Sequence, residues 1–124
     1  MPMKKALIVD DESVNCLLLE MALDGICEVQ SVNSGEACLQ ALPTFNPDIV
    51  LLDINMPGMT GIEVCQKLKA DNDTASIPVI FITALEGAEI RAEAKEAGGA
   101  LFMCKPIDTD ELVEVVTATL AENS

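Results

Sequence analysis

The sequence contains no histidine, tryptophan or tyrosine, and it contains only three phenylalanines. Without histidine the chain offers no imidazole base, no imidazole metal ligand and no phosphohistidine. Without tryptophan and tyrosine it lacks the aromatic surfaces on which flavins and single-stranded nucleic acids stack. Any chemistry in this chain therefore has to use carboxylates, hydroxyls or lysine.

Basic residues are also scarce, since seven Lys and Arg stand against 21 Asp and Glu, a net charge of -14. This charge repels nucleic-acid phosphates and anionic membrane surfaces, so we expect no direct nucleic-acid partner and no membrane partner. The N-terminus lacks the apolar stretch of a signal peptide, and the apolar runs are too short to span a bilayer. These features predict a cytoplasmic protein.

The five cysteines are odd in number and form no C-x-x-C pair or metal-ligand spacing. Each one lies in an apolar segment. We therefore expect a reduced, intracellular protein whose cysteines act as small buried hydrophobic residues. The positions are Cys16, Cys27, Cys38, Cys65 and Cys104.

The 124 residues, half of them hydrophobic, predict one domain over residues 1–124 that needs no disulfide or structural metal. Apolar runs of strand length alternate with segments of helical period, which is typical of α/β proteins with a parallel sheet. We expect a single (βα)5 domain with a five-stranded parallel sheet of order 2-1-3-4-5 and helices on both faces. The expected strands are 6–9, 27–32, 49–52, 79–82 and 100–104, with 27–32 at an edge.

Four helices have recognisable N-terminal capping residues: Ser13, Ser34, Thr60 and Asp108. The last two also show capping-box spacing, with a glutamate three residues later. The segment 86–97 contributes mainly Ile90 and alanines, so we expect its helix to pack weakly.

Polar residues follow directly on four of the predicted strands. Asp10 and Asp11 follow the first strand, Asp53 the third, Thr83 the fourth and Lys105 the fifth. Each alone could be an ordinary cap, turn or solvated residue. Parallel strands bring their carboxyl ends to one edge of the sheet, where α/β proteins bind ligands. The combination therefore predicts a site at that edge.

Three carboxylates at one edge repel one another, and a hard divalent cation relieves that repulsion. A small set of oxygen ligands suits Mg²⁺, which shares its coordination sphere with phosphate oxygens. A carboxylate can attack phosphorus, and a lysine can balance charge on the phosphoryl oxygens. The pattern therefore indicates phosphoryl transfer.

Four motifs carry a family resemblance: IVDDE (8–12), LLDINMPGMTG (51–61), FITAL (81–85) and CKPID (104–108). Together, and at these separations, they resemble the response-regulator receiver domain of two-component signalling, a flavodoxin-like, chemotaxis-regulator type of domain. The resemblance covers nearly the whole chain. It implies that Asp53 accepts a phosphoryl group from a phosphohistidine on a sensor histidine kinase or histidine phosphotransfer protein. It also implies that the domain modifies only itself and is not an enzyme that turns over a substrate.

The resemblance implies further roles at the same edge. Mg²⁺ would be bound by Asp10, Asp11, Asp53 and the backbone carbonyl of Asn55. Lys105 would pair with the acceptor carboxylate and then with the phosphoryl group, and the Lys105-Pro106 bond would be cis.

The resemblance also implies a switch in which Thr83 turns toward the phosphoryl oxygens and Phe102 turns inward behind it. We expect partners to read this change on the face formed by 86–97, 100–104 and 109–120. The output would pass either to a separate downstream protein or to a fused output domain.

Two positions depart from the usual receiver pattern. Ala100 and Leu101 stand where many receivers have acidic residues, which indicates either extra strand burial or a docking patch. Leu85, with Asn55, stands where the hydrolytic water would pass, so it would affect the lifetime of the phosphorylated state.

Three other functions remain as alternatives. A small Mg²⁺-dependent aspartyl-phosphate phosphohydrolase would have D-x-D after the first strand and usually a cap domain, neither of which this sequence offers. An FMN carrier would need a less acidic first loop and aromatic cover for the ring. A receiver-like adaptor that is never phosphorylated would not need all five active-site residues.

Overall fold

The computed structural model describes residues 3–122 and contains one parallel sheet. Its strands are β1 (Lys5–Val9), β2 (Glu28–Val32), β3 (Ile49–Leu52), β4 (Val79–Thr83) and β5 (Leu101–Cys104). Their order is β2-β1-β3-β4-β5, and every neighbouring pair is parallel. The predicted strands, strand order and fold class are confirmed.

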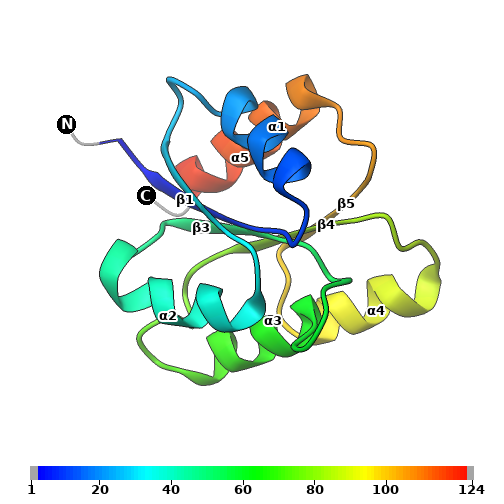
Figure 1. The fold of residues 1–124 in the computed structure, drawn as a ribbon. Helices are drawn as coiled ribbons and strands as arrows, with labels where there is room; N and C mark the ends of the chain where they lie inside the picture. Colours follow the sequence, from blue (N-terminus) through cyan, green and yellow to red (C-terminus); the bar gives the residue numbers. More distant parts are fainter. Residues whose placement is uncertain (1–2, 123–124) are drawn as a thin grey trace.

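Five helices cover the sheet: α1 (Ser13–Ala22), α2 (Gly35–Phe45), α3 (Gly61–Ala70), α4 (Ala88–Glu96) and α5 (Thr109–Glu122). Figure 1 shows α1 and α5 on one face of the sheet and α2, α3 and α4 on the other. This two-sided cover follows from the right-handed crossover that each helix makes between parallel strands. Within residues 3–122, no helix combines the length and apolar character needed to cross a bilayer.

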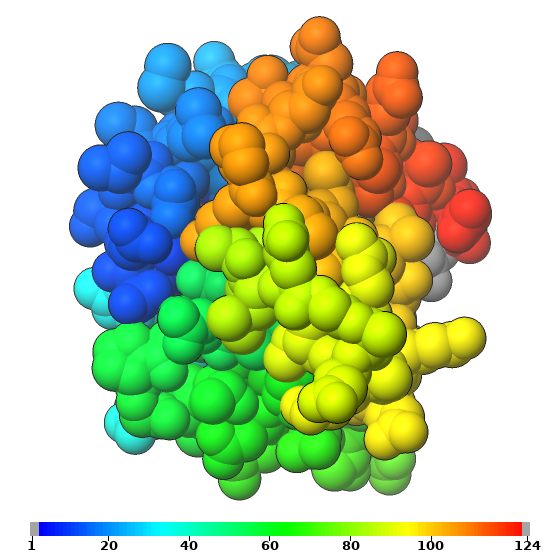
Figure 2. All heavy atoms as spheres, turned by 90° about the vertical axis from the view of Figure 1, so that its right-hand side faces the viewer, coloured from blue at the N-terminus to red at the C-terminus, as the bar shows by residue number. Residues whose placement is uncertain are grey.

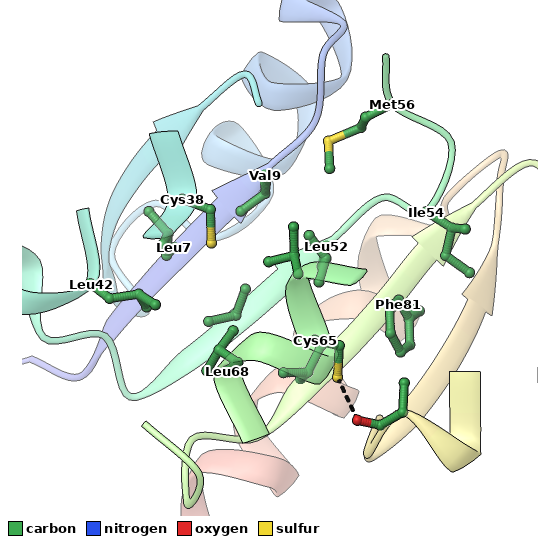
Figure 3. Packing of buried hydrophobic residues seen from close by; sticks show 14 of the residues in the cluster. Leu7, Val9, Cys38, Leu42, Leu52, Ile54, Met56, Cys65, Leu68 and Phe81 are labelled. Carbon is green, nitrogen blue, oxygen red and sulfur yellow. Dashed lines mark hydrogen bonds between the residues drawn. The ribbon is translucent and has the colours of Figure 1, made fainter. Parts of the chain in front are cut away.

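The central strands β1, β3 and β4 are buried on both faces, which explains their continuous apolar sequences. Successive side chains alternate between two cores, so Leu7 packs toward α2 and α3 (Figure 3) while Ile8 packs toward α1 and α5. Strand β2 is at one edge of the sheet and is partly exposed, as its alternating sequence predicts. Among residues 3–122, its one neighbour in the sheet is β1, which is consistent with its partial exposure.

Four of the five cysteines are buried, as predicted, whereas Cys104 is half-buried, so the prediction of burial was wrong for this residue. Burial raises the pKa of the Cys38 thiol to about 12. The Cys65 thiol donates a hydrogen bond to the carbonyl of Ala97 at 3.3 Å, drawn in Figure 3. These thiols therefore behave as packing groups in the folded protein.

The helix starts follow the predicted caps with one exception. Thr60 forms the full capping box with Glu63, and the Ser34 hydroxyl accepts a hydrogen bond from the Ala37 amide at 3.1 Å. The Asp108 carboxylate accepts hydrogen bonds from two amides of the first turn of α5. Ser13 was the wrong cap, because α1 begins one residue earlier, with Glu12 at the N-cap position.

The earlier start of α1 has a local cause. The Asp10 carboxylate accepts a hydrogen bond from the Glu12 amide at 2.9 Å and so turns the chain before Ser13. The Glu12 carbonyl then accepts hydrogen bonds from the amides of Asn15 and Cys16. Asp10, which follows β1, therefore determines where this helix begins, and Ser13 does not.

Helix α4 is weakly packed, as its composition predicts. Ala94 is the buried residue in this helix, and Ile90 is half-buried. The N-cap Gly87 has φ 122° and contributes no side-chain hydrogen bond to the helix start. Little apolar area therefore fixes α4 against the sheet.

Candidate functional site

The loops that follow the strands gather on one face of the molecule. Figure 2 shows this face, where the blue, green, yellow-green and orange segments that follow β1, β3, β4 and β5 meet. In the sheet, Val9 of β1 pairs with Leu52 of β3, so the residues that follow them, Asp10 and Asp53, lie side by side. The strand register thus explains why two aspartates far apart in sequence become neighbours.

Lys105 joins these two aspartates. Its Nζ lies 2.9 Å from Asp10 Oδ2 and 3.3 Å from Asp53 Oδ2, and it donates a hydrogen bond to each. The lysine follows β5, which is separated from β3 by β4, so its long side chain reaches across the strand end of β4. The structure therefore brings together three of the predicted site residues through one ammonium group.

The site is largely removed from solvent. Asp10 is 2% exposed, Asp53 is 4% exposed and Thr83 is fully buried. Burial raises the pKa of Asp53 above its ordinary value and the charge of Asp10 raises it further, although Lys105 opposes both effects. Burial alone would lower the pKa of Lys105, but the two carboxylates together raise it. The lysine is thus held as a cation between two crowded acids.

The loop after β3 is shaped by a close contact at Gly61. A Cβ at this position would lie 2.2 Å from the carbonyl oxygen of Asp53, so only glycine fits. The Gly61 amide donates a hydrogen bond to the Ile54 carbonyl at 2.9 Å, and the Asn55 amide donates one to Asp53 Oδ1 at 3.3 Å. The start of α3 therefore presses against the backbone of Asp53 and fixes its position.

A second acidic group lies at the same edge. One carboxylate oxygen from each of Asp10, Asp11 and Glu12 lies within 4.8 Å of the other two, and Asp11 and Glu12 are exposed. Hard oxygen donors of this kind fit Mg²⁺. The sequence prediction of ligands did not include Glu12, although this residue belongs to the IVDDE motif. Asp53 is linked to this group through Lys105 and is not one of its three members.

Thr83 and Phe102 lie on the neighbouring strands β4 and β5. The Thr83 hydroxyl accepts a hydrogen bond from the Leu85 amide at 3.2 Å, and its carbonyl accepts one from the Lys105 amide at 2.8 Å. Phe102 pairs with Phe81 in the sheet and is half-buried. The Lys105-Pro106 bond is cis, as the resemblance implies. One backbone hydrogen bond thus connects the residues that carry the threonine hydroxyl and the lysine ammonium.

Two surface features differ from or add to the predictions. Leu101 is 46% exposed and Ala100 is also exposed, so extra strand burial was the wrong interpretation of this pair.

On α1 the sequence reasoning missed an exposed apolar stripe. The helical spacing was visible in the sequence, but α1 carries apolar residues on two sides and the pattern could not tell which side faces the core. The exposed residues are Val14, Leu17, Leu18 and Met21.

Comparison with known proteins identifies the family and the fold. The family model of the response regulator receiver domain matches residues 6–117, which include every site residue described above. The chain belongs to this receiver domain family. Within the family, receiver domains generally bind Mg²⁺ at an acidic pocket, and this chain has an acidic cluster formed by Asp10, Asp11 and Glu12.

Among proteins of known identity, the receiver is 45% identical over 105 residues to the response regulator PleD of Caulobacter vibrioides, covering 84% of the chain but 23% of PleD. It is 32% identical to the protein PilH of Pseudomonas aeruginosa, covering 96% of the chain and 99% of PilH. It is 33% identical to the DNA-binding response regulator MtrA of Mycobacterium tuberculosis, covering 97% of the chain and 52% of MtrA.

Solved structures support the same assignment. A putative response regulator from Chloroflexus aurantiacus superposes with a TM-score of 0.91 at 32% identity, over 98% of this chain and 99% of that one. The BeF3-activated DrrB receiver domain superposes with a TM-score of 0.87 at 27% identity, over 96% and 98% of the two chains.

Proposed function

We propose that this receiver, spanning residues 1–124, takes a phosphoryl group onto Asp53 in a Mg²⁺-dependent reaction. The donor is a phosphohistidine of a sensor histidine kinase or histidine phosphotransfer protein, and the reaction takes place in the cytoplasm. The observation that carries this proposal is the pairing of Asp53, 4% exposed, with Lys105 at 3.3 Å and with Asp10 beside it.

In the proposed reaction, an oxygen of Asp53 forms a bond to phosphorus while the phosphorus–nitrogen bond of the phosphohistidine breaks. The electron pair of that bond passes to the imidazole nitrogen. Asp10, Asp11, Asp53 and the Asn55 carbonyl are the proposed ligands of Mg²⁺, with Glu12 close by. When bound, the ion would supply positive charge to the phosphoryl oxygens. Lys105 keeps its ammonium at the acceptor and then binds the transferred group.

The proposed switch begins with the added charge on Asp53. The phosphoryl oxygens accept hydrogen bonds from Thr83 and Lys105, so the Thr83 hydroxyl leaves its bond to the Leu85 amide. Phe102 follows on the adjacent strand, and the face formed by α4, β5 and α5 changes shape. The receiver thus acts on itself and passes the signal by contact to a downstream protein or a fused output domain.

The donor protein is proposed to dock on α1. Its exposed stripe lies beside a hollow of about 430 Å³ whose lining includes Leu18, Pro106 and Ile107, and Lys105 lines the same hollow. A donor helix placed there would bury apolar area next to the acceptor. Replacing both Leu17 and Met21 by glutamine should slow transfer from a phosphotransfer protein that serves the wild-type chain. Phosphorylation by a small-molecule donor should not change.

Intact-mass measurement with Mg²⁺ and acetyl phosphate tests the proposed function. The wild-type chain should gain one phosphoryl group, and Asp53→Asn should gain none. Asp73→Asn, at an exposed aspartate outside the site, serves as the matched control and should behave like the wild type. Turnover of many donor molecules without a retained adduct would indicate the alternative phosphohydrolase. Unchanged labelling of Asp53→Asn would exclude Asp53 as the acceptor.

A further inference from the structure

Arg91 is the one arginine of the chain, and it makes an unusual set of contacts. Its guanidinium carbon lies 4.6 Å from the centre of the Phe102 ring, within the range of a cation–π interaction. The same guanidinium group donates a hydrogen bond to Cys104 Sγ at 3.5 Å. Arg91 belongs to α4, whereas both of its partners belong to β5. One side chain therefore spans the two elements.

The guanidinium group makes these contacts although the chain is rich in carboxylates. Within residues 3–122, the ion pairs are both made by Lys105. Along α4 and its N-cap, the positions three and four residues from Arg91 are Gly87, Ala88, Ala94 and Lys95, so no acid lies at helical pairing distance. The sequence around Arg91 therefore leaves its charge available for the aromatic ring.

The contact matters because α4 has few others. Ala94 is the buried residue of this helix, and β5 is an edge strand whose one partner, in the part of the chain that the structure describes, is β4. Arg91 and Phe102 also line a hollow of about 410 Å³ between α4 and β5. The ring thus has open space beside it and a cation over its face. The contact between Arg91 and Phe102 therefore restrains both the ring and α4.

We propose that Arg91 is a latch that holds Phe102 and α4 in the resting arrangement. This inference rests on the proposed function, because it concerns the movement of Phe102 that follows phosphorylation. Moving the ring away from Arg91 breaks the stack, so the stack opposes the activated state. Arg91 does not touch the reacting atoms and acts as a positioning residue.

The magnitude follows from the exposure of the contact. Cation–π interactions at exposed sites change an equilibrium by about two- to fivefold. Removing the latch should therefore shift the resting receiver toward the activated state by about that factor. Arg91→Lys keeps the charge but loses the planar stack, so it should shift the equilibrium by less than Arg91→Ala.

The experiment uses the full chain, Mg²⁺ and beryllofluoride as a phosphoryl mimic. Phenylalanine labelled with ¹³C gives signals from three rings, Phe45, Phe81 and Phe102, which Phe102→Leu assigns. In the resting protein, Arg91→Ala should shift the Phe102 signal. It should also lower the beryllofluoride concentration for half conversion two- to fivefold. Lys95→Ala, which removes a charge one turn later on α4, is the control and should change neither.

Each result decides the matter. A midpoint that is unchanged or raised in Arg91→Ala would overturn the latch while leaving the proposed function intact, since the wild type would still respond. An unmoved resting Phe102 signal in Arg91→Ala would also overturn it. No response of the wild type to beryllofluoride would overturn the proposed function and the latch together. An equal shift in Lys95→Ala would assign the effect to net charge and refute the stack.

Discussion

Replacing Lys105 by methionine tests the electrostatics of the site most directly. The change removes the ammonium that Asp10 and Asp53 share at 2.9 and 3.3 Å and keeps an unbranched side chain. Both carboxylates then stay buried with no cation between them. A buried charge that loses its partner is strongly destabilising, so the free energy of unfolding of the metal-free protein should fall.

The magnitude can be worked from the geometry. Two carboxylate oxygens bound to one ammonium lie at most about 6 Å apart, which gives a repulsion of about 3 kcal/mol at an effective dielectric constant near 20. Breaking a buried pair typically costs about 3–5 kcal/mol, and the 16% exposure of the lysine side chain favours the lower end. We expect a loss of about 3 kcal/mol, or a fall of about 12 °C in Tm for a domain of this size.

The loss should depend on pH and on Mg²⁺. Burial raises the pKa of Asp53 in the folded state, so its neutral form favours folding at low pH and that contribution is lost as pH rises through the folded pKa. The stability that Lys105→Met loses relative to the wild type should therefore become smaller as the pH falls from neutral to about 5. Saturating Mg²⁺ should also reduce it, because the cation replaces part of the missing positive charge.

Thermal unfolding followed by circular dichroism, in EDTA and in Mg²⁺, measures both effects. Lys95→Met, at an exposed lysine with no described ion pair, is the control and should change Tm little. A deficit that is the same at both pH values and in both buffers would show that lost packing, and not charge, is responsible. A variant as stable as the wild type would refute the argument.

Three further predictions concern the acceptor and its loop. In EDTA, Asp53→Asn should raise the Tm measured by thermal unfolding, because the buried charge is gone. It should also reduce the increase in Tm that accompanies a fall in pH from neutral to about 5. Gly61→Ala should cost about 2–3 kcal/mol in urea unfolding and slow phosphorylation of Asp53, since the new Cβ meets the Asp53 carbonyl; normal labelling would contradict this. Thr60→Ala should cost about 1 kcal/mol by the same measurement while leaving labelling intact, because it removes only the N-cap.

The sequence predicted the fold well because its signals were local and repeated. Continuous apolar runs such as 49–52 fit only strands buried on both faces, and the polar residue after each run then marks the edge where ligands bind. The joint presence of Asp10, Asp53 and Lys105 could be anticipated for the same reason. Their mutual contact follows from the strand order and from the length of the lysine side chain.

Other features could not be read from the pattern because they depend on three-dimensional packing. The start of α1 was misplaced because a side chain from the strand end, Asp10, caps the amide of Glu12. The exposed side of α1 was missed because two apolar stripes on one helix look alike in sequence. The stack of Arg91 on Phe102 joins residues of two elements whose relative position is determined only by the folded chain.

The distribution of thiols gives this receiver a built-in reporter of its own opening. Desolvation raises the pKa of the thiols of Cys16, Cys27, Cys38 and Cys65, whereas Cys104 remains partly accessible. An alkylating reagent should therefore modify one site quickly in the native protein and the other four only when the domain opens. Cys38 and Cys65 lie in one core, and Cys16 and Cys27 lie in the other. The number of labels added, measured by intact mass, would therefore show whether the two cores open together or one after the other.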